Sequence, residues 1–173
     1  MILIASADNN WGIGNKGSLL VRISNDMKNF RRLTTGNVIV LGRKTLETFP
    51  NGLPLAQRTN IILTHNEDFK AKDAVIVHNL KELFKELSYY KKDEIFIVGG
   101  ESVYNLLAPY CDKAIITKID YKYQADAHIP NFDELPNWEM VEESEEETCF
   151  DIIYTYRTYV NHKPLPMEIQ QGE

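Results

Sequence analysis

The chain has 173 residues, of which 43% are hydrophobic and 25% charged, and its net charge is −6. This length suffices for one domain with a sizeable core and no disulfide or metal staples, and the composition excludes a chain dominated by disorder. The longest basic clusters are the pairs Arg31-Arg32 and Lys91-Lys92, so the chain lacks the electrostatic footprint of a nucleic-acid-binding protein. No apolar run approaches the length of a membrane span.

The N-terminus and the two cysteines indicate the compartment. The first residues lack the basic region and the long apolar region of a signal peptide, so we expect a cytoplasmic protein. Cys111 and Cys149 lie far apart, with neither metal-type spacing nor a histidine at motif distance. We therefore expect two reduced thiols and no metal site.

A short apolar run, residues 2–7, predicts a buried strand in the centre of a sheet. Residues 8–23 contain three glycines with asparagines between them, which predicts one long, mobile loop. Loops of this length in compact domains usually serve as lids or binding loops. A loosely ordered surface loop is the alternative, but Trp11 and Ile13 are too apolar for a loop that faces only water.

The stretch from Ser24 to about Thr35 predicts a helix that carries a carboxylate on a mostly apolar face. Ser24 can cap this helix, and Asp26 lies near the positive end of the helix dipole. Asp26 and Phe30 are four residues apart and share a face, with Met27 beside them. An aspartate in a first turn is more often a cap than a buried acid with a chemical role, so this pattern alone leaves both interpretations open.

Two apolar strands end in glycine and lead directly into helices. Residues 38–41 run into Gly42-Arg43-Lys44-Thr45, and residues 95–98 run into Gly99-Gly100. A glycine at a strand end lets a ligand approach the backbone, and a helix start with cationic and hydroxyl side chains can hold phosphate. Each junction alone is weak evidence, because many strand-to-helix turns have such sequences and paired glycines also serve tight turns.

The rest of the chain continues the alternation of strand and helix and then changes. Strands are predicted at 60–64, 74–77 and 114–119, and helices at 80–87, capped by Asn79, and at 101–107. Residues 138–141 and 150–160 predict two antiparallel strands, with the acidic run between them as a solvated hairpin tip. We predict one domain over residues 1–160 and a frayed tail over 161–173.

Taken together, the motifs of this chain resemble those of the dihydrofolate reductases. The resemblance runs in order through residues 1–160, and the motifs are jointly specific. They are Trp11-Gly12-Ile13-Gly14, Asp26 with Met27 and Phe30, Gly42-Arg43-Lys44-Thr45, the segment from Arg58 to Thr64, Val98-Gly99-Gly100 with Tyr104, Thr117, and Asp126-Ala127-His128-Ile129-Pro130. The resemblance implies a single α/β domain with an eight-stranded, mostly parallel sheet, four helices, an antiparallel C-terminal hairpin and a cis peptide bond between Gly99 and Gly100.

The resemblance also implies the reaction, which is hydride transfer from NADPH to the imine carbon of dihydrofolate, supplying tetrahydrofolate for one-carbon metabolism. Asp26 would hydrogen-bond the pterin and, supported by Thr117, favour the protonated imine, while the proton itself would arrive through water. Arg58 would clamp the glutamate α-carboxylate of the substrate, although a surface arginine is the alternative for this residue. The other implied substrate contacts are Ala5, Met27, Phe30 and Leu55.

For NADPH, the resemblance implies a site built from the glycine-rich junctions and the long loop. Arg43, Thr64 and His65 would lie near the phosphorylated ribose, although His65 is equally consistent with an ordinary loop histidine. The complete implied set is Ala5, Ile13, Gly14, Gly42, Arg43, Lys44, Thr45, Thr64, His65, Val98, Gly99, Gly100 and Tyr104. We expect a monomer that acts on a small molecule.

One stretch departs from the family, which usually has Leu-Pro-Trp where this chain has Leu19-Leu20-Val21. The missing tryptophan would help to hold a water near the pterin, so water placement and antifolate binding need not follow the family. Two other functions share part of the pattern: a reductase of similar fold that acts on a pyrimidine intermediate of riboflavin synthesis, and a non-catalytic nucleotide-binding module. Asp26, Phe30 and Arg58 favour folate, and the intact acid argues against a non-catalytic module.

Overall fold

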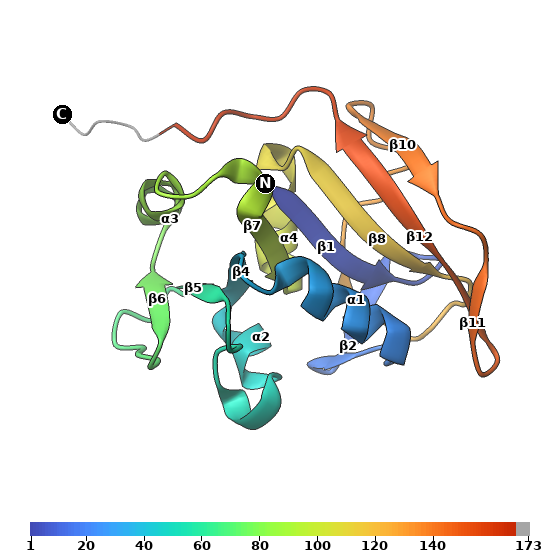
Figure 1. Ribbon diagram of the computed structural model, residues 1–173, viewed down its shortest axis with the longest axis horizontal. Coiled ribbons are helices and arrows are strands. Elements are labelled where there is room, and N and C mark those ends of the chain that lie inside the picture. The colour runs from blue at the N-terminus through green and yellow to red at the C-terminus, as the bar shows by residue number, and fades with distance from the viewer. Residues whose placement is uncertain (169–173) are drawn as a thin grey trace.

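The computed structural model describes residues 1–168, which form one nine-stranded sheet, a separate three-stranded sheet and four α-helices (Figure 1). Along the large sheet the strands follow the order β10 (Trp138–Glu143), β12 (Ile152–Asn161), β8 (Lys113–Ile119), β1 (Ile2–Ala7), β7 (Ile95–Gly99), β4 (Val38–Gly42), β5 (Thr59–Leu63) and β6 (Ala74–Val77). The short strand β11 (Glu147–Cys149) pairs with β12 outside this path.

Strands β8, β1, β7, β4, β5 and β6 run parallel, whereas β12 and β10 are antiparallel to their neighbours. The predicted α/β fold with a mostly parallel sheet and an antiparallel C-terminal hairpin is therefore confirmed. Strand β1 lies between β8 and β7, so its predicted position inside the sheet is confirmed. Its apolar run is continuous because a strand covered on both faces needs no alternation with polar residues. The expected cis peptide bond between Gly99 and Gly100 is present.

Helices cover both faces of the sheet. On one face, α1 (Ser24–Thr34) and α2 (Arg43–Glu47) pack against a cluster that includes Ile4 and Ile39. On the other face, α3 (Leu80–Leu87) and α4 (Glu101–Leu107) pack in a cluster that includes Leu3 and Val40. In Figure 1, α1 lies in front of the sheet and α4 behind it. Successive strand residues thus supply opposite layers, which is why the apolar runs are continuous.

Short 3-10 helices occupy three of the connections, at Pro50–Gly52, Lys92–Glu94 and Ala108–Tyr110. The cap of α3 is as predicted, since the side chain of Asn79 accepts a hydrogen bond from the Glu82 amide. The predicted cap of α1 was wrong: Ile23 takes the N-cap position and makes no side-chain cap bond, while Ser24 is already inside the helix. Asp26 is therefore not needed as a cap, and its carboxylate can turn toward the sheet.

The prediction of one long, mobile loop over residues 8–23 missed two short strands. This segment contains β2 (Gly12–Asn15) and β3 (Ser18–Leu19), which form the small sheet with β9 (Ala127–His128). Backbone amides that the loop would leave unpaired are satisfied by two carboxylates: Asp8 accepts from the amides of Gly12 and Tyr123, and Asp126 accepts from the amide of Lys16. Glycine spacing alone could not reveal this pairing, because the partner lies far along the chain.

The hairpin tip was misplaced. Glu142 and Glu143 lie in β10 and Glu147 in β11, so the acidic run is mostly part of the sheet, and the tight turn falls at Phe150, which has a positive φ of 56°. Glu143 pairs with Arg157 on the neighbouring strand β12, which compensates its charge. All five glutamates of the run are exposed, so the prediction of a solvated run is confirmed. The error was to place the whole run in a turn, because opposite charges across a strand pair allow exposed glutamates within strands.

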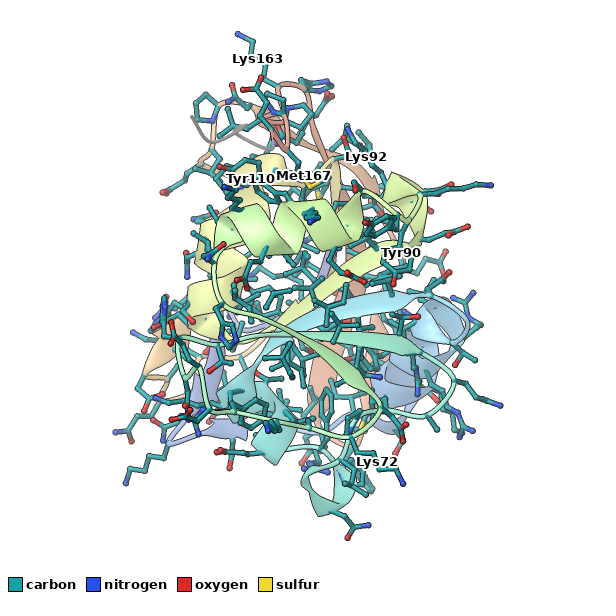
Figure 2. All side chains as sticks on the ribbon, turned by 90° about the vertical axis from the view of Figure 1, so that its left-hand side faces the viewer. Lys72, Tyr90, Lys92, Tyr110, Lys163 and Met167 are labelled. Carbon is teal, nitrogen blue, oxygen red and sulfur yellow. The ribbon has the colours of Figure 1, made fainter. Side chains whose placement is uncertain are left out.

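The C-terminal segment leaves the sheet after Asn161, the last residue of β12. The amide of Leu165 donates to the carbonyl of Pro109, and Met167 packs against the core beside Tyr110, as Figure 2 shows. The expectation of a frayed tail stays a prediction, and its last five residues, 169–173, lie outside the described part of the chain.

Both cysteines are free, as predicted. Within residues 1–168, no three or more His, Cys, Asp or Glu side chains are grouped so that they could hold a metal ion. None of the helices in this part of the chain is long and apolar enough to cross a membrane.

Asn60 is a polar side chain buried in β5, with 1% of its surface exposed. Its amide oxygen accepts from the Leu55 amide at 3.0 Å, and its amide nitrogen donates to the carbonyls of Leu55 at 2.9 Å and Arg58 at 3.2 Å. One side chain therefore fixes the backbone of the loop that precedes β5. This loop carries two of the residues that the resemblance assigns to substrate binding.

We predict that Asn60→Ala lowers the free energy of unfolding by about 1–3 kcal/mol, because the loop loses three hydrogen bonds and the partly buried Leu55 backbone loses its partners. Urea denaturation measures this change. The matched control is Asn79→Ala, which removes an exposed helix cap and typically costs about 1 kcal/mol. A smaller loss for Asn60→Ala than for Asn79→Ala would show that the loop does not depend on Asn60.

Candidate active site

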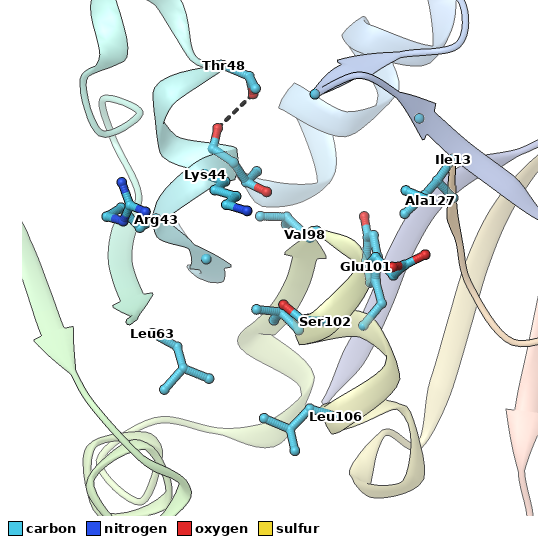
Figure 3. Close-up of a pocket in the computed structure, with 18 of the residues that line it drawn as sticks. Ile13, Arg43, Lys44, Thr48, Leu63, Val98, Glu101, Ser102, Leu106 and Ala127 are labelled. Carbon is cyan, nitrogen blue, oxygen red and sulfur yellow. Dashed lines mark hydrogen bonds between the residues drawn. The ribbon is translucent and has the colours of Figure 1, made fainter. Parts of the chain in front are cut away.

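A cleft of about 1060 Å³ opens at the carboxyl ends of the parallel strands. Its walls include the ends of β1, β4, β5 and β7, the starts of α2 and α4, and the small sheet (Figure 3). Ligands of open α/β sheets bind outside the carboxyl ends of the strands, because the loops and helix starts present free backbone groups there. The position of the cleft thus follows from the parallel order of the strands.

All the residues that the resemblance assigns to the cofactor line this cleft. They are Ala5, Ile13, Gly14, Gly42, Arg43, Lys44, Thr45, Thr64, His65, Val98, Gly99, Gly100 and Tyr104. They come from β1, the small sheet, both strand-to-helix junctions, the residues after β5, and α4. The resemblance thus implied a set of residues that the fold brings to one cavity.

The glycines of the two junctions leave room along the cleft wall. A Cβ atom at Gly100 would lie 3.2 Å from the Thr45 hydroxyl, and one at Gly42 would lie 3.3 Å from the Val103 side chain. Gly99 has a φ of +126°, a conformation that other residues rarely adopt. The junctions therefore approach each other so closely that larger side chains would close the space between them.

The start of α2 supplies the positive charge of the cleft. Arg43, Lys44 and Thr45 all line it, and Figure 3 shows the Lys44 and Arg43 side chains diverging from the start of this helix. Arg43 forms an ion pair with Glu47 at 2.7 Å, one turn further along α2. Both members of this pair are partly exposed, so the pair contributes little to the stability of the fold. Two cations and a hydroxyl at one helix start suit phosphate groups.

Asp26 lies in the first turn of α1, and its carboxylate meets hydroxyl groups of the sheet. Thr117 donates to one carboxylate oxygen at 2.5 Å, and Ser6 donates to the other at 3.2 Å. Burial raises the pKa of Asp26 above its ordinary value, and the hydrogen bonds from Thr117 and Ser6 oppose that rise. Ser6 also lines the cleft, so the carboxylate lies next to the cavity without being part of its wall.

The remaining residues implied for the substrate are not all gathered in the cleft. Ala5 lines the cavity, Phe30 and Leu55 pack against the core under α1, and Met27 is 47% exposed. Arg58 donates from Nε to the Thr34 hydroxyl at 3.2 Å and from one terminal nitrogen to the Ala56 carbonyl at 3.0 Å. These contacts fix the Arg58 guanidinium beside α1.

Three features of the site were missed by the sequence interpretation. Ser6 contacts Asp26, but a serine inside an apolar strand gave no signal without the strand register. Asn60 holds the loop of Leu55 and Arg58, and a polar residue in the middle of an apolar strand could have suggested this. Tyr104 donates from its hydroxyl to the Ile4 carbonyl at 2.7 Å, which anchors α4 to β1 behind the cleft.

Val21, which replaces the family's usual tryptophan, packs partly buried against a small cluster formed by Ile23, Ile119 and Tyr154. Tyr156 belongs to the same cluster. The segment between β3 and α1 is therefore anchored by apolar contacts rather than by a large indole.

Comparisons with known proteins show the family and the fold of this chain. The family model described as dihydrofolate reductase matches residues 1–161. The dihydrofolate reductase of Bacillus subtilis is 36% identical over 138 residues, covering 80% of this chain and 79% of the relative, and that of Staphylococcus haemolyticus is 37% identical over 134 residues, covering 76% and 78%. A solved structure of dihydrofolate reductase from Enterococcus faecalis, complexed with NADP(H) and RAB-propyl, superposes with a TM-score of 0.81 at 30% identity, covering 92% of this chain and 95% of that one. The chain belongs to the dihydrofolate reductase family.

Proposed function

We propose that this protein catalyses the NADPH-dependent reduction of dihydrofolate to tetrahydrofolate, with Asp26 as its catalytic acidic residue. The observation that carries the proposal is the Asp26 carboxylate, which two hydroxyls hold beside a cleft of about 1060 Å³. Family membership over residues 1–161 supports the reaction. Protonation of the imine makes its carbon more electron-deficient, so that it accepts hydride more readily. A neighbouring carboxylate favours this protonated form through its negative charge.

The cleft residues fit a dinucleotide cofactor. Gly42, Gly99 and Gly100 leave a cradle that Cβ atoms would fill, and Arg43 and Lys44 supply cations at the start of α2. The NADP(H) complex of the Enterococcus faecalis relative supports the choice of cofactor. When bound, NADPH supplies the hydride. In our proposal Arg43, Thr64 and His65 bind its phosphorylated ribose, and Ala5 and Gly14 border the nicotinamide.

The substrate would occupy the space between Asp26 and the residues of α1 and its neighbouring loop. Met27, Phe30 and Leu55 offer apolar contacts, and Arg58, held by Thr34 and Ala56, offers a fixed cation for the glutamate carboxylate. Thr117 would keep the acid oriented toward the pterin. A cytoplasmic location and a monomeric state stay predictions from the sequence.

The reaction is tested by mixing the protein with NADPH and dihydrofolate and following the nicotinamide absorbance. For Asp26→Asn we expect turnover near neutral pH to fall by roughly 10²–10⁴-fold, because the variant keeps the shape but loses the charge that favours the protonated imine. Its activity should recover as pH falls, since more dihydrofolate is then protonated in solution. Parental turnover of Asp26→Asn at neutral pH would exclude the catalytic role.

The same variant has an expected effect on stability. The pKa of Asp26 is raised in the folded protein, so the protonated carboxyl group is favoured by folding. Its stabilising contribution is fully present below the ordinary pKa of an aspartate and is lost as pH rises through the folded-state pKa. Asp26→Asn should therefore be more stable than the parent at neutral pH, and this advantage should vanish in acid. Thermal melts across pH measure it, and a destabilised variant at neutral pH would contradict the assignment of a buried, costly carboxylate.

Cofactor preference provides a further prediction. Arg43→Ala should narrow the preference for NADPH over NADH by roughly ten- to a hundredfold, because the variant loses a charge-assisted contact to the ribose phosphate and such a contact changes affinity by about that factor. Values of kcat/KM for the two cofactors measure the preference. Glu47→Gln is the matched control, because it removes the ion-pair partner but leaves the Arg43 cation, and it should keep the parental preference. Equal use of NADH by the parent protein would refute the role of Arg43.

A further inference from the structure

Three neighbouring strands present a row of hydroxyl-bearing side chains beneath α1. In the register of the sheet, Ser6 of β1 is paired with Thr117 of β8, and Thr117 is paired with Tyr156 of β12. Residues paired in this way point to the same face of a sheet. That face is the one covered by α1, because Ile4, two residues before Ser6, packs in the cluster that contacts this helix.

Two members of the row contact Asp26, and each contacts a different oxygen. Thr117 donates to Oδ1 and Ser6 donates to Oδ2, so both carboxylate oxygens have their own donor and the plane of the group is fixed. Thr117 is buried, whereas Ser6 is partly exposed and lines the cleft. Ser6 is therefore the donor on the cleft side of the carboxylate.

We propose that Ser6 is a positioning residue of the reaction, which acts through its hydrogen bond to keep Asp26 ionised and turned toward the cleft. This inference rests on the proposed function. Thr117 alone would leave Oδ2 without a donor from the sheet, and the carboxylate could then turn about the Thr117 hydrogen bond. With both donors present, the negative charge stays where a protonated imine could face it.

The ionisation of Asp26 depends on few other groups. The titratable side chains that its charge influences are Tyr104 of α4 and Tyr156 of β12, and burial, followed by the negative charge of Asp26, raises the pKa of both. Both tyrosines are thus neutral at ordinary pH. In the described residues 1–168 no cation pairs with the carboxylate, so burial is opposed by the hydroxyls of Thr117 and Ser6 alone. Removing one of two donors should therefore have a measurable effect.

The test is an NMR titration of the free protein carrying ¹³C-carboxyl-labelled aspartate, with the Asp26 signal assigned by its absence in Asp26→Asn. In Ser6→Ala, Asp26 should titrate at higher pH than in the parent, with a roughly tenfold lower ratio of ionised to protonated carboxylate at a given pH. Because this measurement needs neither substrate nor cofactor, it tests Ser6 even if the protein proves inactive on dihydrofolate. An unchanged titration in a folded Ser6→Ala variant would overturn the proposal.

Two variants control for general changes in the strand. Ser6→Thr restores a hydroxyl in a residue that suits strands, and it should return the titration toward that of the parent. Tyr156→Phe removes the third hydroxyl of the row, which donates no hydrogen bond to Asp26, and should leave the titration unchanged. If Tyr156→Phe shifts the titration as much as Ser6→Ala, the effect belongs to packing and the assignment of Ser6 fails.

Turnover gives the second readout. Protonated Asp26 no longer favours the protonated imine, so the advantage of the parent over Asp26→Asn should fade as pH falls. In Ser6→Ala that advantage should fade at a higher pH than in the parent, with kcat affected more than KM. A drop in kcat by the same factor at every pH would indicate a structural loss and overturn the proposal.

Discussion

A carboxylate that has left bulk water needs hydrogen-bond donors, and the site of this protein depends on how Asp26 obtains them. The donors come from two neighbouring strands, while the carboxylate comes from the helix that covers them. The arrangement therefore exists only when α1 is docked on the assembled sheet. Secondary structure alone does not create it, because the three residues involved are separated by up to 111 positions in the sequence.

The fold could be predicted largely from local patterns, because a parallel sheet buried on both faces requires continuous apolar strands and alternating helices. Strand β1 and helix α4 have the predicted bounds, and the Asn79 cap of α3 is the predicted one. The errors fall where a distant partner decides the structure. Residues 12–15 form a strand between residues 18–19, which follow a tight turn, and residues 127–128, and glycine spacing carries no information about the second partner.

The site was predictable in a different way. Glycine, arginine and lysine at a strand-to-helix junction suit phosphate binding but are weak evidence alone, and the family resemblance assigned them to one cofactor site; those residues do line one cleft. Ser6 could not be predicted, because its role depends on its register against Thr117, and register is not visible within a single apolar run. The helix pattern alone favoured a cap as the role of Asp26, and in the structure Ile23 takes the N-cap position instead.

The small sheet couples two distant segments at the mouth of the cleft. Asp126 accepts from the Lys16 amide and donates its own amide to the Gly14 carbonyl, and the Ile129 amide donates to the Trp11 carbonyl. Since Ile13, Gly14, Asp126 and Ala127 all border the cavity, neither segment can move away from it without breaking bonds to the other. Amide hydrogen exchange in the two segments should consequently follow one common opening event. These two segments would then behave as a single cooperative unit assembled from both halves of the chain.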